Sequence, residues 1–177
     1  LLFEDNASAY LTGLIAGRMT ETNKVGFIGG MESPVISKFD YGFRAGVKAA
    51  NPDAEVMVQY ANSFTDSALG KTIANQMHSK NADIIFTCAG AVGIGAIEAA
   101  KENGKKAIGV DQDQNALAPK NVITSAMKNI DVAVVELLSK VVDGSYKGGE
   151  VIINTLAMNG VGIPPTSNKN VPPDVLE

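Results

Sequence analysis

Two carboxylates directly follow one apolar segment of the sequence. In AIGVDQDQ, Asp111 and Asp113 come straight after residues that have the character of a buried strand. A fixed carboxylate accepts strong, directional hydrogen bonds from hydroxyl groups such as those of a sugar diol. Asp is also common in turns and helix caps, so a purely local role is the alternative. We favour a ligand role for Asp111 and leave Asp113 open between a site and the surface.

An aromatic residue, a glycine and a lysine follow three other apolar segments. Phe64 lies in the polar turn ANSFTDS, Gly90 opens GAVGIGA, and Lys128 follows VITSAM. An aromatic ring outside the core can stack on a base or a sugar ring, and a glycine lets a ligand approach the backbone. Lys128 would pair with Asp111 and donate to ligand hydroxyls. The local alternatives are peripheral packing for Phe64 and simple solvation for Lys128.

Two apolar residues complete the candidate set. Met31 and Val35 follow the segment FIGG and could supply an apolar wall to a ligand. Ordinary packing or surface exposure explains them equally well. Together with the polar candidates they suit a polar small molecule that has a flat apolar part.

The glycines of GAVGIGA allow a weaker, enzymatic alternative. Their order is G-x-x-G-x-G and differs from the dinucleotide fingerprint G-x-G-x-x-G, and they follow the third expected strand, whereas the fingerprint follows the first. Asp111, at the end of the next strand, does imitate the acid that binds a ribose in such enzymes. A nicotinamide- or flavin-dependent enzyme therefore stays open, although packing of the glycines between helix and sheet is the simpler explanation.

Alternating strand and helix signals supply a scaffold for these residues. Apolar strands are expected at 24–30, 55–60, 83–90, 106–110, 122–127 and 150–158, and helices at 34–50, 66–80, 92–103 and 130–142. This alternation predicts an α/β fold with a parallel, doubly wound sheet covered by helices on both faces. Ligands of such sheets bind outside the carboxyl ends of the strands, which is where the candidates lie.

The composition excludes several classes of protein. With 177 residues, 45% of them hydrophobic, the chain can build one sizeable core. Its net charge of -4 is spread along the chain without a basic stripe, so we expect no nucleic-acid partner. One cysteine and one histidine predict neither a disulfide nor a Cys/His metal site, and we expect no cofactor.

The chain carries no targeting or membrane-spanning signal. No apolar run is long enough to cross a bilayer. It opens LLFEDN, without an initiator Met, and continues directly into an expected helix. The sequence has the character of a processed piece, so a targeting segment could precede it.

Four stretches, in this order along the chain, resemble the basic membrane protein family: KVGFIGGMESPVISKFDYGFRAGVKAANPDAEV, YANSFTDSALGK, ADIIFTCAGAVGIGAIEAAKENGKKAIGVDQDQ and VITSAMKN. The members it resembles are purine nucleoside receptor-type lipoproteins that serve as substrate-binding components of ABC transporters. The resemblance implies a type I periplasmic-binding-protein fold, in which two lobes close on the ligand. It also implies an extracytoplasmic, membrane-anchored protein that works with a permease and has no catalytic activity.

The resemblance assigns roles to the matching positions. Phe64, in SFTD, is similar to the second-lobe aromatic that stacks on the base, while Gly90, Asp111 and Lys128 are similar to positions that contact the ribose. Ala89 stands where the more distant ribose-binding proteins have Asn, so that contact is not expected. A related sugar- or autoinducer-binding receptor, or a repressor core of the same fold, stays open as an alternative.

The family's chains are longer and include a complete first lobe, whereas this chain matches their carboxy-terminal half. The implied division is a first-lobe helix remnant at 1–23, the second ligand-binding lobe at 24–128, a first-lobe helix at 129–149, and a late strand with a Pro-rich surface tail at 150–177. Such a chain would hold half of the site and bind weakly, because clamping by the other lobe supplies much of the burial. Its exposed apolar remnants could drive self-association.

Overall fold

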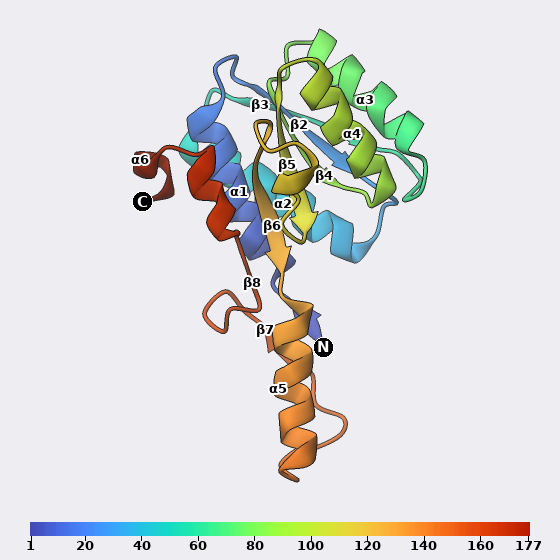
Figure 1. Cartoon of the computed structure of the whole chain (residues 1–177), viewed down its shortest axis with the longest axis vertical. Coiled ribbons are helices and arrows are strands. Elements are labelled where there is room, and N and C mark those ends of the chain that lie inside the picture. The colour runs from blue at the N-terminus through green and yellow to red at the C-terminus, as the bar shows by residue number, and fades with distance from the viewer.

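A six-stranded sheet in the order β3-β2-β4-β5-β6-β8 forms the centre of the protein (Figure 1). The computed structural model describes residues 1–177. Five strands pair in parallel, and the short β8 pairs antiparallel with β6 at one edge. The strands are β2 (Lys24–Gly29), β3 (Glu55–Tyr60), β4 (Ile84–Cys88), β5 (Lys106–Asp111), β6 (Val122–Lys128) and β8 (Val161–Gly162). The predicted parallel, doubly wound α/β fold is confirmed.

Helices cover both faces of this sheet. The remaining elements are β1 (Leu2–Phe3), α1 (Asp5–Met19), α2 (Pro34–Ala50), α3 (Ser67–Ser79), α4 (Ala91–Glu102), η1 (Asn115–Leu117), α5 (Ile130–Val142), β7 (Ile153–Asn154), η2 (Pro165–Lys169) and α6 (Pro173–Leu176). Because side chains alternate across a strand, Phe27 joins α1 and α2 in one core while Ile28 joins α3 and α4 in the other. The expected helices and main strands agree with these bounds within two residues at each end.

Helix α1 belongs to the main body, which differs from its expected role as a remnant of the first lobe. Ala9 and Ala16 have no exposed surface and lie in the same core as Phe43 of α2. Small side chains on α1 let the two helices approach closely. Because few of its buried residues are large and apolar, the sequence of α1 gives only a weak signal of burial. Helix α1 therefore packs as part of the sheet-centred body.

The C-terminal segment is also part of the body, although a surface tail was expected. Only Ile153–Asn154 of the expected strand at 150–158 is extended, and it pairs with β1. Ser167 and Val171 are 1% and 3% exposed, and the Ser167 hydroxyl lies 2.8 Å from that of Thr124 in β6. The segment therefore packs against part of the sheet, although it is rich in proline.

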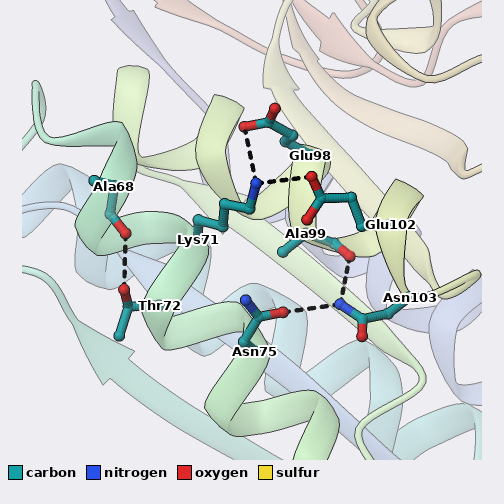
Figure 2. A network of polar contacts seen from close by, with 8 residues as sticks. All are labelled: Ala68, Lys71, Thr72, Asn75, Glu98, Ala99, Glu102 and Asn103. Carbon is teal, nitrogen blue, oxygen red and sulfur yellow. Dashed lines mark hydrogen bonds and ion pairs between the residues drawn. The ribbon is translucent and has the colours of Figure 1, made fainter.

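A network of polar contacts joins the outer surfaces of α3 and α4 (Figure 2). The Lys71 ammonium lies 2.8 Å from a carboxylate oxygen of Glu102 and 3.7 Å from one of Glu98. One turn further along, the Asn103 amide donates to the Asn75 carbonyl oxygen at 2.8 Å. Exposed ion pairs contribute little to stability, so the network mainly fixes how the two helices align. The loops that precede these helices carry Phe64 and Gly90.

Helix α5 projects away from the body as a separate arm (Figure 1, orange). Ala133 is its one buried residue, while Val135 and Leu138 are 64% and 55% exposed. The loop at 143–150 that follows is exposed throughout. None of the protein's helices has both the length and the apolar character that a bilayer span requires.

Candidate functional site

A depression of about 400 Å³ lies at the carboxyl ends of the central strands. Its lining consists of Gly90, Ile94, Val110, Asp111, Gln112, Gln114, Lys128, Ile130 and Asp131. Three predicted site residues, Gly90, Asp111 and Lys128, come from three different strand ends and meet here. We call this place the ligand edge, defined by these three residues and the adjacent Phe64.

Asp111 ends β5 in an unusual backbone conformation. Its φ of 65° lies in the left-handed region, which Asp tolerates better than most residues. Surrounding protein removes part of its hydration and raises the pKa of the carboxyl group; nearby Lys128 opposes this rise, and Asp5 adds to it. The carboxylate takes part in no ion pair, although its surface in the depression is open. It is therefore available to accept hydrogen bonds from a ligand.

Lys128 does not pair with Asp111 as expected. Its ammonium lies 3.0 Å from the Asp5 carboxylate, at the start of α1. It also lies over the rings of Phe3 and Phe39, 5.3 and 5.9 Å from their centroids. The expected pair was wrong because Lys128 pairs with Asp5, an acid that is far from it in the sequence but close to it in the fold. Lys128 is thus held by Asp5 and also lines the depression.

Phe64 and Gly90 are coupled through their backbones. The Phe64 carbonyl accepts a 2.8 Å hydrogen bond from the Ala91 amide, at the first residue of α4. Gly90 has a φ of 58°, and a Cβ there would lie 2.8 Å from the same carbonyl oxygen. Both the conformation and the close approach require glycine. Gly90 therefore keeps the Phe64 turn beside the depression.

The Phe64 ring is a partly exposed surface, as a stacking role requires. The side chain is 40% exposed, and the ring lies over Gly30, where an added Cβ would be 2.1 Å from it. The Ser63 hydroxyl accepts hydrogen bonds at 3.2 Å from the amides of Thr65 and Asp66, which fixes the turn. Asp66 caps the start of α3: its carboxylate accepts a 2.9 Å hydrogen bond from the Leu69 amide. Phe64 does not line the depression itself but stands beside it, next to Gly90.

The three secondary candidates lie outside the depression. Met31 and Val35 are 51% and 43% exposed, at the end of β2 and the start of α2. Asp113 is committed to the fold: it accepts from the Asn115 amide at 3.0 Å and from the Thr166 hydroxyl at 2.7 Å. The structure therefore gives Asp113 the local role that the sequence had left open.

Sequence reasoning missed several residues of this edge. Gln112, Gln114 and Asp131 line the depression, and Asp5 lies behind Lys128. The Gln114 carbonyl accepts from the Val110 amide at 3.0 Å, which folds the loop after β5 back over the strand. Acids at a helix start are ordinarily explained by the helix dipole, so no local signal marked Asp5 as part of a site.

The chain matches known proteins over nearly its whole length. A family model described as "ABC transporter substrate-binding protein PnrA-like" (Bmp) matches residues 1–176. Basic membrane protein B of Borreliella burgdorferi is 42% identical over 168 residues, which are 93% of this chain and 49% of that protein. The ABC transporter nucleoside-binding protein BmpA of Lactococcus lactis is 41% identical over 178 residues, covering 91% and 51%. The chain spans about half the length of the curated relatives it matches.

Solved structures show the same architecture. A solute-binding protein of an ABC transporter system from Aeropyrum pernix superimposes with a TM-score of 0.84 at 31% identity, covering 92% of this chain and 48% of that one. A transcriptional activator of the comK gene from Bacillus halodurans gives 0.88 at 26% identity, covering 98% and 59%. A putative LacI-family repressor from Corynebacterium glutamicum gives 0.62 at 14% identity, covering 86% and 62%, and shows a shared fold alone.

These matches confirm the resemblance to the basic membrane proteins and the fold that it implies. The chain belongs to the Bmp family of PnrA-like ABC transporter substrate-binding proteins.

Proposed function

We propose that the whole protein captures a purine nucleoside for uptake and that this chain supplies one side of the binding site. The observation that carries the proposal is the pairing, at one sheet edge, of an available carboxylate with a partly exposed aromatic ring. A nucleoside has matching parts, a diol and a flat base. The relative from Lactococcus lactis is named as nucleoside-binding, which supports the same class of ligand.

Each residue of the ligand edge has a distinct role in this proposal. Phe64 stacks on the base, which contributes roughly 1–3 kcal/mol. Asp111 accepts hydrogen bonds from ribose hydroxyls, and Lys128 donates to a ribose oxygen with the protons that Asp5 leaves unused. Gly90, which has no side chain, lets the sugar approach the backbone. No group is called on to make or break a covalent bond, so the ligand leaves unchanged and the protein is not an enzyme.

The proposal extends to the setting in which capture is useful. Binding proteins of ABC transporters present their ligand to a permease, so the whole protein would act outside the cytoplasm, anchored to the membrane as a lipoprotein. Reduced uptake of labelled guanosine by cells that lack the protein, restored by the native gene but not by its Asp111→Ala form, would support this setting. Unchanged uptake would contradict it.

Helix α5 fits the same proposal. It exposes valine and leucine side chains that an isolated helix in water would not favour. Because the chain spans about half the length of its relatives, we assign residues 129–149 to the first lobe of the complete binding protein. Closure of that lobe would cover the ligand edge and complete the burial of the ligand.

NMR titration can test the ligand assignment even if binding to this chain is weak. Guanosine, inosine, adenosine and ribose would each be added to ¹⁵N-labelled protein, and we expect shifts at Phe64, Gly90, Asp111 and Lys128. Nucleosides should bind more tightly than ribose. Phe64→Ala should remove most of that preference, and Asp111→Ala should weaken ribose and nucleoside alike.

The control is Asp53→Ala, an exposed acid just before β3 and therefore at the opposite edge of the sheet. It should leave every affinity unchanged. Equal affinity for ribose and nucleosides would overturn the nucleoside assignment in favour of a sugar receptor. Absorbance of a bound nicotinamide or flavin in purified protein, lost on Gly90→Ala, would instead favour the dinucleotide-dependent enzyme.

A further inference from the structure

We infer that Asp5 is a positioning residue of the ligand edge, which holds Lys128 away from Asp111 so that both charges stay available to a ligand. The inference rests on the proposed function for its consequence in binding. Its structural part concerns three charged groups of the protein alone. It begins with the burial of Asp5.

Asp5 is an acid with almost no access to water. It is 3% exposed at the first residue of α1. Its two carboxylate oxygens lie 3.0 Å from the Lys128 ammonium and 4.0 Å from that of Lys38. A buried charge is costly unless it is paired, so Asp5 requires a cation close by. Lys38 is 41% exposed in its side chain and more distant, which leaves Lys128 as the main partner.

The position of Lys128 is fixed from four elements. Besides Asp5 of α1, the ammonium contacts the rings of Phe3 from β1 and Phe39 from α2, while its own backbone ends β6. Its side chain is only 17% exposed. A long side chain held in this way has already lost much of its rotamer freedom, so less is lost when a ligand binds.

Without Asp5, Lys128 would have other acids within reach. Met127, its neighbour in β6, is the register partner of Asp111 in β5, and Asp131 lines the same depression. Opposite charges that line one depression attract more strongly where water is partly excluded than they do in bulk water. A Lys128–Asp111 pair would occupy the carboxylate that ribose hydroxyls need. Asp5 prevents this by offering the lysine a closer, buried partner.

The first test needs no ligand and uses Asp5→Asn, which keeps the shape and removes the charge. In the native protein the Phe3 and Phe39 rings should shift the Lys128 ε-methylene protons upfield in NMR spectra. In Asp5→Asn this signal should move toward that of a free lysine. The pKa of Asp111 should fall, because Asp5 no longer raises it and the Lys128 charge has moved closer.

Two further variants serve as controls. Lys38→Met removes the weaker partner of Asp5 and should leave the Lys128 signal in place. Phe3→Leu, at a half-buried position, removes one of the two rings and should move the same signal by a smaller amount, which checks that the rings cause the shift. An unchanged Lys128 signal in folded Asp5→Asn, or in Asp5→Ser if the first variant is unfolded, would overturn the inference.

The second test measures binding. Asp5→Asn should lower the affinity for guanosine roughly three- to tenfold, the loss expected when a charged side chain must be freed and reordered. Asp5→Asn combined with Lys128→Met should bind no worse than Lys128→Met alone, because Asp5 acts through the lysine. Additive losses would contradict the positioning role. If the native protein does not bind nucleosides but the Lys128 signal moves in Asp5→Asn as expected, the proposed function fails and the positioning role stands.

Discussion

The sheet-centred body and the α5 arm use the same kinds of apolar residue in opposite ways. In the body, Phe43 and Phe86 have no exposed surface and their ring centroids lie 5.2 Å apart. In the arm, Val135 and Leu138 are more than half exposed. Apolar periodicity predicts helices in both regions. In the body the apolar faces of the helices pack against the sheet, whereas the apolar face of α5 packs against nothing comparable. The arm therefore leaves an apolar face uncovered within this chain, whereas the apolar side chains of the body cover one another.

The largest effect expected from this comparison is on stability. Phe86→Ala should lower the free energy of unfolding by about 3–5 kcal/mol, because it leaves a cavity where β4 meets α2. Leu138→Ala, its counterpart on the arm, should change it by less than about 0.5 kcal/mol. Urea denaturation of both variants measures the difference. Similar losses would mean that the arm packs against the body in solution.

The second prediction concerns association between copies of the chain. The exposed face of α5 should make the protein self-associate, and Val135→Glu with Leu138→Glu should shift it toward monomer in sedimentation velocity. Tyr41→Glu is the matched control, since Tyr41 is 63% exposed but belongs to the body. If both changes disperse the assembly equally, general surface hydrophobicity and not the arm is responsible.

The third prediction tests whether the C-terminal segment belongs to the body. Thr166→Val removes the hydroxyl that donates to Asp113 at 2.7 Å. The free energy of unfolding should fall by about 0.5–1.5 kcal/mol, the usual net contribution of one hydrogen bond. Thr65→Val, an exposed threonine in the Phe64 turn, should have no such effect in the same denaturation experiment. Equal stability of native protein and Thr166→Val would place the segment with the arm.

The smallest effect is expected at the ligand edge. Because the pKa of Asp111 is raised in the folded protein, folding favours the protonated acid. This contribution is fully present below the ordinary pKa of Asp and is lost as the pH rises through the folded value. Asp111→Asn should therefore be slightly more stable than native protein at neutral pH while binding guanosine less well. Near pH 3, about one unit below that ordinary value, the stability difference should vanish; a destabilised variant at neutral pH would contradict this.

The sequence predicted the body well because its signals are local. Apolar strands alternating with amphipathic helices specify α2 to α4 and the sheet between them. The strand-end rule predicts that Gly90, Asp111 and Lys128 lie together, and in the structure they line one depression. Position relative to the strands was enough for these residues.

The errors share a different physical origin. Asp5 and Lys128 are far apart along the chain, as are Thr166 and Asp113, and only the assembled fold brings each pair together. Spacing therefore suggested the wrong partner for Lys128. The packing of α1 against the body was not predicted because its buried face consists mostly of small and polar residues, with Ile15 as its one large apolar side chain. Pairings that depend on chain topology are invisible to local patterns.

The connection between the α5 arm and the body determines what happens when the chain is cleaved in the arm. The Asn129 amide donates to the Gly160 carbonyl at 2.9 Å, and Leu2–Phe3 pairs with Ile153–Asn154, so the outgoing and returning segments are bonded where they meet the body. A single cut within the exposed loop at 143–150 would release neither fragment, because the C-terminal piece stays bonded to β1 and β6. The nicked protein would migrate as one species when native and as two when denatured. If the two pieces are expressed separately and mixed, we expect them to associate through the same strand pairs.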